Sequence, residues 1–178
     1  MLRVLIINFL ILIPLVLSQQ PGRCPIISGV SFNPYTAAGF WYRNRLSSNG
    51  FDNKLTCETI LFSPLDRSNY TIKMDSISTI TNTKSSVVVE GNANGNTYKY
   101  HVPLLGEIDI DAYVLGTDDN RWRILWGCMN HGNTHTEVAR VYTRQRIPDE
   151  DELERFIDQS FKRWGLQKPK FTKIDQNC

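Results

Sequence analysis

The sequence predicts an all-β protein, an eight-stranded antiparallel up-and-down β-barrel with one α-helix near the carboxyl end packed outside it. Between residues 40 and 146, short runs rich in Val, Ile, Thr and Tyr alternate with Gly, Asn, Asp and Ser, which is typical of antiparallel strands and their turns. A helical pattern of apolar residues follows residue 146. Closing consecutive strands into a barrel removes exposed sheet edges. A two-sheet sandwich is the alternative that the strand pattern also allows.

The first eighteen residues have the features of a secretory signal peptide. Arg3 supplies an early positive charge, an unbroken apolar run follows, and small or polar residues precede Gln19. The apolar run is short for a membrane span, so a membrane anchor is the weaker interpretation. We expect residues 1–18 to be removed, residues 19–178 to form a single domain, and the protein to be secreted and extracellular.

The charge balance excludes some partners. Without Arg3 the 20 basic residues become 19, against 18 acidic ones, so the mature chain is close to neutral. Such a chain has no field that would attract nucleic acid or an acidic membrane. No later segment is apolar enough to be an integral membrane segment, and we expect apolar or small partners.

The expected strands alternate most clearly in TYKYHV, where Tyr98, Tyr100 and Val102 share one face and Lys99 and His101 share the other. One face of this strand is therefore expected to be buried and the other to face water. The eight expected strands are residues 40–47, 55–64, 70–80, 86–91, 97–104, 110–117, 121–129 and 137–146.

The expected helix lies in IPDEDELERFIDQSFKRWG, at residues 147–165. Acidic residues occupy its first turns and Lys162 and Arg163 its last, which suits the helix dipole, and Gly165 can end it. Its apolar stripe should lie on the outside of the sheet. The stripe consists of Leu153, Phe156, Ile157, Phe161 and Trp164.

Four cysteines follow the leader, and an even number in an exported chain predicts two disulfides, for which the sequence alone allows three pairings. A zinc site is the weaker alternative, because zinc ligands come in closely spaced pairs and these residues are scattered. The cysteines are Cys24, Cys57, Cys128 and Cys178. A glycosylation sequon at Asn69 predicts that this segment lies at the surface.

Three segments in order, together with the cysteines, resemble the lipocalins, and within them the apolipoprotein D, insecticyanin, bilin-binding and Lazarillo group. FNPYTAAGFWY resembles the family's opening motif, with Gly39 and Trp41 in its Gly-x-Trp. AYVLGTDDNRWRILWGC resembles the second motif at Thr117 and Asp118, and VYTRQR resembles the third, with Arg144 as its arginine. The closing KPKFTKIDQNC also resembles the family's carboxyl end.

The resemblance implies the barrel known as the lipocalin calyx, with Trp41 plugging its closed end and Arg144 packed over the indole as a cation–π contact. Gly39 would let the entering chain approach closely. It also implies the pairing Cys24–Cys128 and Cys57–Cys178. Two departures are visible: Asp119 follows Thr117-Asp118 where the family often has tyrosine, and Arg43 stands where this group commonly has glutamate.

The candidate ligand-binding surface is aromatic, and a cavity so lined would hold a flat apolar molecule. The alternative is that these residues fill the barrel or lie under the helix, since a register slip of one residue reverses the faces. The candidates are Tyr98, Tyr100, Val102, Trp122, Ile124 and Trp126.

No metal site is expected. His131 and His135 are interpreted as solvated loop histidines, because no ligand with suitable spacing accompanies them beyond Glu137. His101 is expected on the wet face and is discounted as a haem ligand.

The expected function is that of a secreted carrier rather than an enzyme. No catalytic motif is legible, and the prostaglandin synthase type of lipocalin needs a free cysteine that two disulfides would remove. No cofactor is required. A bilin, retinoid, carotenoid, sterol or fatty acid all suit the cavity. The alternative is an extracellular recognition module that binds a cell-surface receptor or another protein through its open-end loops.

Overall fold

The computed structural model describes residues 19–47, 54–94, 97–101 and 111–178. The expected signal peptide at residues 1–18 and the candidate ligand residue Val102 lie outside the described residues.

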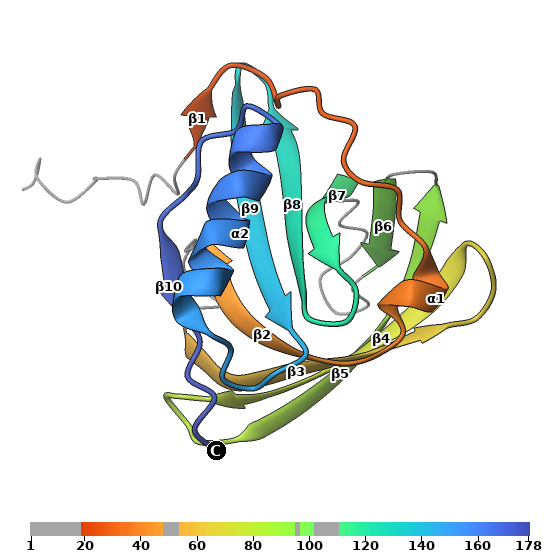
Figure 1. Cartoon of the computed structure of the whole chain (residues 1–178), viewed down its shortest axis with the longest axis vertical. Coiled ribbons are helices and arrows are strands. Elements are labelled where there is room, and N and C mark those ends of the chain that lie inside the picture. The colour runs from red at the N-terminus through yellow and green to blue at the C-terminus, as the bar shows by residue number, and fades with distance from the viewer. Residues whose placement is uncertain (1–18, 48–53, 95–96, 102–110) are drawn as a thin grey trace, which may run out of the picture.

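The described strands form one antiparallel sheet that closes on itself (Figure 1). The sheet order is β1-β9-β8-β7-β6-β5-β4-β3-β2-β10, and β9 pairs with β2 as well as with β8. This second pairing joins the ends of the sheet, so the predicted eight-stranded barrel, β2 to β9, is confirmed. The strands are β1 (Gln20–Pro21), β2 (Gly39–Ser47), β3 (Leu55–Pro64), β4 (Asn69–Ser78), β5 (Lys84–Asn94), β6 (Thr97–His101), β7 (Asp111–Asp118), β8 (Trp122–His131), β9 (Thr134–Thr143) and β10 (Phe171–Lys173).

The largest differences from the expected strand bounds are in β5 and β9. β5 is longer than predicted at both ends. β9 begins and ends three residues earlier than predicted. Just beyond its end, the Arg144 amide donates to Arg121 O at 2.8 Å. The short strands β1 and β10 were not predicted, since two or three residues carry no readable alternation.

The helix α2 (Glu150–Arg163) lies outside the barrel across β7 and β8, as predicted (Figure 1). Asp149 caps it by accepting a hydrogen bond from the Glu152 amide at 2.8 Å. Its buried side chains Leu153, Ile157 and Phe161 pack against Leu115 of β7 and Ile124 of β8. No helix in the described part of the chain is long and apolar enough to cross a membrane.

A second apolar cluster includes Ala37 of the short helix α1 (Pro34–Ala37) and residues of the barrel wall. Phe32 contacts Phe62 and Tyr70 edge to face, with ring centroids 5.8 and 5.9 Å away, and Phe62 and Tyr70 stack at 4.6 Å. These buried rings fix the chain that enters β2 and so position the base of the barrel.

The segment after β10, residues 174–178 and here called the tail, fills the space between β2 and β3. Among the described residues, β2 pairs with β3 over Gly39–Tyr42 and then with β9 up to Leu46. Where β2 and β3 part, the Ile174 amide donates to Asn44 O at 3.0 Å and the Cys57 amide donates to Asp175 O at 2.8 Å. The tail therefore bridges the two strands through its own backbone.

Two disulfides tie these outer segments to the barrel, in the pairing that the family resemblance implied. Cys24 is bonded to Cys128 with 5.8 Å between the Cα atoms, and Cys57 to Cys178 with 6.1 Å. The described chain holds no free cysteine. Each bridge closes a long loop, which is where a cross-link restricts the unfolded chain most.

Candidate ligand-binding cavity

Trp41 forms the floor of the barrel and is 2% exposed. Its indole Nε1 donates to Ala37 O at 2.8 Å, and the guanidinium carbon of Arg144 lies 3.7 Å from the ring centroid. Arg144 also donates to Ala38 O at 2.8 Å and to Phe40 O at 2.9 Å. Burial lowers the pKa of Arg144 below its ordinary value, and the nearby Arg123 lowers it further. The contact is structural, because each polar group in it is satisfied by the protein itself.

Gly39 is required where the chain turns into this floor. Its φ is +97°, a region that side chains with a Cβ rarely adopt, and a Cβ there would lie 3.1 Å from Arg144 Nη1. The glycine two places before the indole therefore makes room for the arginine that covers it.

Asp119 organises the turn between β7 and β8 beneath the cavity. Its carboxylate pairs with Arg123, whose guanidinium carbon lies 5.4 Å from the Trp41 ring, and it accepts from Thr117 Oγ1 at 2.8 Å. Burial raises the pKa of Asp119, but hydrogen bonds from Arg123, Thr36 and Thr117 outweigh it and hold the pKa below its ordinary value. Asp118 instead accepts from Arg121 Nε at 2.7 Å. Both acids of this motif are therefore occupied in holding the turn.

A cavity of about 290 Å³ lies inside the barrel above Trp41. One wall is apolar: adjacent residues of β3, β4 and β5, Ile60, Met74 and Val87, form a row across it. The described lining residues are Phe32, Trp41, Arg43, Leu55, Glu58, Thr59, Ile60, Phe62, Ile72, Met74, Asp75, Ser76, Ser85, Val87, Val89, Ala112, Arg123, Leu125, Trp126, Gly127, Val138, Arg140 and Tyr142.

The facing wall, from β2, β9 and β8, carries charged and phenol groups together with Leu125 and Val138. Arg43 of β2 pairs across the sheet with Tyr142 of β9, which pairs with Arg123 of β8. Arg140 also lines this side, and Glu58 forms an ion pair with Arg43. The cavity is thus amphipathic, since the apolar row of Ile60, Met74 and Val87 shares it with guanidinium, carboxylate and phenol groups.

Two of the candidates on β8, Trp122 and Ile124, are not among the lining residues of this cavity. Trp122 stacks on Phe156 of α2 at 4.3 Å between ring centroids, and Ile124 is buried beneath the same helix. The cavity is lined by the intervening residues Arg123, Leu125 and Gly127. At Trp122 and Ile124 the prediction had the wrong face of β8, because α2 buries the outer face there.

The remaining described candidates are Trp126 on β8 and the two tyrosines on β6. Trp126 packs beneath α2 and donates from Nε1 to Glu137 at 3.3 Å, yet part of the residue also reaches the cavity wall. Tyr98 and Tyr100 lie on β6, where their backbones pair with Ala93 and Gly91. Their contact with a ligand stays a prediction. The sequence analysis did not identify Glu58 as a cavity residue, although it is separated from Ile60 and Phe62 by two and four positions along the strand.

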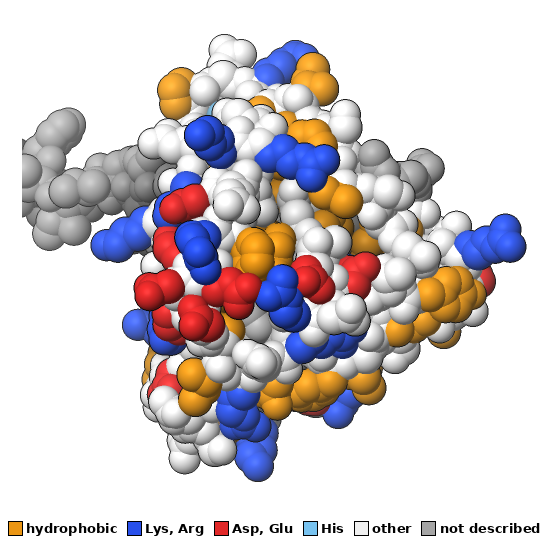
Figure 2. Space-filling model, in the orientation of Figure 1, with side chains coloured by type: hydrophobic (Ala, Val, Ile, Leu, Met, Phe, Trp, Pro, Cys, Tyr) orange, Lys and Arg blue, Asp and Glu red, His pale blue; other side chains and the backbone are white. Residues whose placement is uncertain are grey.

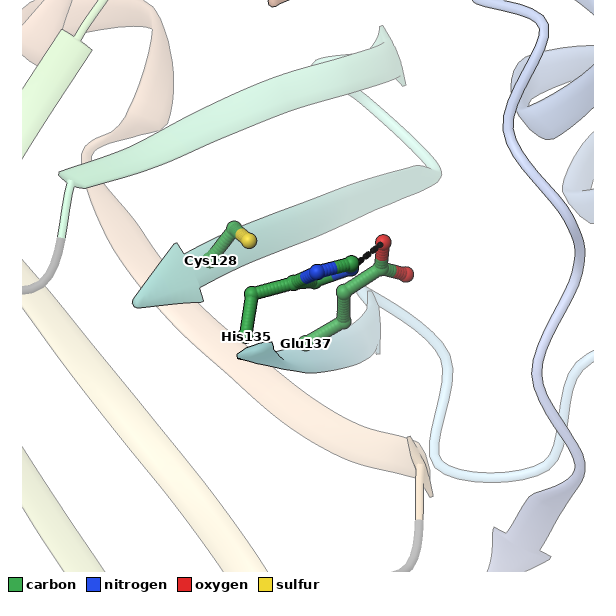
Figure 3. A group of neighbouring side chains, drawn as sticks. All are labelled: Cys128, His135 and Glu137. Atoms are coloured by element: carbon green, nitrogen blue, oxygen red, sulfur yellow. Dashed lines mark hydrogen bonds and ion pairs between the residues drawn. The ribbon is translucent and has the colours of Figure 1, made fainter. Parts of the chain in front are cut away.

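His135 is buried, which corrects the expectation of a solvated loop histidine. It is 5% exposed because residues 20–24 cover it, with its Nδ1 3.0 Å from Gly22 O and its Nε2 3.2 Å from Glu137 Oε1. Figure 3 shows Cys128 beside this pair. The Cys128 sulfur is bonded to Cys24, so the group offers no thiolate to a metal. His131 is exposed, as expected.

The sequon asparagine Asn69 is exposed at the start of β4. Its amide donates to Asp66 Oδ2 at 2.7 Å and accepts from Asn92 at 2.8 Å. The surface position agrees with the expectation, and glycosylation at Asn69 stays a prediction.

The outer surface over α2 carries charges of both signs. Figure 2 shows acidic and basic side chains lying together there, and Lys168 pairs with Glu154 at 2.6 Å and Asp158 at 2.5 Å. These charges compensate one another locally, in keeping with the near-neutral chain.

The closed barrel, the external helix and the interior cavity together define a lipocalin fold, and comparison with solved structures agrees. Lobster apocrustacyanin A1 matches with a TM-score of 0.75 and 16% identity, over 90% of this chain and 92% of that chain. Insecticyanin from the tobacco hornworm Manduca sexta matches with a TM-score of 0.73 and 16% identity, over 88% of each chain. The siderocalin Ex-FABP matches with a TM-score of 0.57 and 17% identity, over 80% of this chain and 96% of that chain.

No family model and no curated protein matches the sequence. The chain has the lipocalin fold, which its motifs indicated.

Proposed function

We propose that this protein is a secreted carrier that binds a small hydrophobic molecule inside its barrel without covalent chemistry. The observation that carries the proposal is the cavity of about 290 Å³ above Trp41, with the apolar wall of Ile60, Met74 and Val87. Pockets that enclose small ligands are mostly apolar with a few placed polar groups, and this cavity has that composition.

Two further observations support the carrier. The siderocalin that shares the fold is described as functioning through dual ligand specificities. Both disulfides fit an extracellular protein, and they leave no cysteine thiol in the described chain to act as a nucleophile.

The test is to purify the protein natively, record its absorbance spectrum and analyse a solvent extract by mass spectrometry. A bilin, retinoid or carotenoid would give visible or near-ultraviolet absorbance, and a sterol or fatty acid would appear in the extract alone. The stripped protein should then bind the neutral fluorescent probe N-phenyl-1-naphthylamine.

A matched pair of variants tests whether the probe binds inside the cavity. Val87→Trp fills the cavity and should weaken probe binding at least about tenfold, which corresponds to ~1.4 kcal/mol. Val88→Trp adds the same ring on the outer face, where Val88 is 53% exposed, and should leave binding unchanged. Circular dichroism checks that both variants are folded. A protein that binds neither the probe nor a panel of lipids would instead favour the recognition module.

A further inference from the structure

A buried carboxylate at the cavity has one oxygen without a partner. Glu58 lines the cavity and is 5% exposed. Its Oε2 forms the ion pair with Arg43, whereas its Oε1 has no hydrogen-bond partner in the part of the chain that the structure describes. Burying a charged acceptor without a donor costs free energy, so such an atom needs a specific reason.

A β-bulge turns Glu58 toward the cavity. Thr56 pairs with Ile77 and Thr59 with Asp75, so two residues of β3, Cys57 and Glu58, stand opposite one residue of β4. In an unbroken strand Leu55 and Glu58 would point to opposite faces, yet both line the cavity. Cys57 has φ +54°. The chain thus takes up an unfavourable backbone conformation at the position that directs this side chain inward.

The tail holds the bulge in place. Cys57 is bonded to Cys178, and its amide and the Thr56 hydroxyl both donate to Asp175 O, at 2.8 and 2.6 Å. Gln176 is 5% exposed, and its side-chain amide donates to the backbone oxygens of Arg43 at 2.9 Å and Glu58 at 3.0 Å. The backbone of both members of the ion pair is therefore fixed from outside the cavity.

We infer that Glu58 Oε1 accepts a hydrogen bond from the bound ligand, so that the cavity selects amphipathic molecules with a hydroxyl or N–H donor. The apolar body of such a ligand lies along Ile60, Met74 and Val87. The donor reaches the Glu58 carboxylate, two residues along β3 from Ile60 and beside Arg43, and satisfies the acceptor that the described protein leaves without a partner. This inference rests on the proposed carrier function and narrows its ligand class.

The test is competition against N-phenyl-1-naphthylamine on the full chain with both disulfides intact. The competitors are 1-dodecanol, dodecyl methyl ether, which lacks the donor, and dodecanoate, which replaces the donor with a negative charge. We expect dodecanol to bind about tenfold tighter than the ether, as a hydrogen bond to a charged group would give. Dodecanoate should bind more weakly than dodecanol, because a second carboxylate would face Glu58.

The variant that isolates the acceptor is Arg43→Met with Glu58→Leu, which removes both charges and so leaves no ion without its partner. It should bind dodecanol and the ether equally, within about twofold. Glu154→Gln, which removes an exposed carboxylate on α2, should keep the wild-type difference.

Equal binding of alcohol and ether to the wild type would overturn the inference, and so would a difference that persists in the double variant. Tighter binding of dodecanoate would overturn it in favour of an acidic ligand recognised by the cavity arginines. If the probe binds nowhere in the barrel, the carrier function itself fails.

Discussion

Two arginines of the barrel, Arg144 and Arg43, satisfy their charges in different ways. Arg144 lies on the Trp41 ring and donates to the backbone oxygens of Ala38, Phe40 and Asp119. Arg43 instead pairs with Glu58, and that pair leaves a carboxylate oxygen without a partner. The base is therefore complete as it stands, whereas the pair in the wall is completed by something that enters the cavity. Groups satisfied within the protein hold the fold, and the incompletely satisfied group is available for recognition.

The largest loss of stability should come from substitutions at the base of the barrel, where Arg144 covers Trp41. Trp41→Ala removes the floor of the barrel and should lower the free energy of unfolding by about 3–5 kcal/mol. Arg144→Ala should cost less, because the indole and its hydrogen bond to Ala37 remain. Urea unfolding of the two single variants and the double variant should give non-additive losses, since each residue packs on the other. Additive losses, or a stable Trp41 variant that loses only its ligand, would assign the indole a different role.

Removing one charge of the Arg43–Glu58 pair should lower the stability of the protein more than removing both. Glu58→Leu alone leaves the Arg43 guanidinium buried beside an alkyl chain and should cost about 3 kcal/mol. Adding Arg43→Met should recover most of that loss, because removing both partners of a buried ion pair is often nearly neutral. Urea unfolding measures both. The control Glu154→Leu, at an exposed ion pair, should cost less than about 1 kcal/mol. A double variant no more stable than Glu58→Leu would show that the pair holds the fold.

The smallest expected effect is a pH dependence of stability that comes from Asp119, near the Trp41 floor. Because the folded pKa of Asp119 lies below its ordinary value of 3.8, its carboxylate stabilises the fold above that value and loses this contribution as the pH falls through the folded pKa. Asp119→Asn should therefore be less stable than the wild type at pH 7. The difference should shrink as the pH falls below about 4, because the Asp119 carboxyl group becomes protonated and then, like the asparagine side chain, carries no charge. Denaturant unfolding from pH 7 to pH 3 tests this, and a constant difference over that range would contradict it.

The base of the barrel was predictable from the sequence because its motif is local. Gly39 and Trp41 are two residues apart, and the conformation that Gly39 adopts is one that only glycine takes readily. The acidic start and basic end of α2 were equally legible, since capping depends on neighbours in the chain.

The cavity walls were not predictable in the same way, because alternation tells which residues share a face but not which face looks inward. On β8 both faces are buried, one by α2 and one by the cavity. One signal was available in the sequence. Cys128, Trp122 and Ile124 all have even numbers, so alternation along the strand places their side chains on the same face. A disulfide to the amino-terminal segment would place that face outside the barrel. The bulge at Cys57 has no counterpart in the pattern, so the inward turn of Glu58 became visible only in the structure.

The shared wall of β2 and β3 is held partly by the tail and not by the pairing of these two strands alone. β8 and β9 pair along their full described length, whereas in the described residues β2 leaves β3 after Tyr42 and then pairs with β10, with the tail between the two strands. Segments held by few ladder hydrogen bonds open at lower free energy than the rest of a fold. Loosening the tail would part the wall directly beside Glu58 while the other strands stay paired. The closure of this wall therefore depends on residues more than a hundred positions away from the strands that they join.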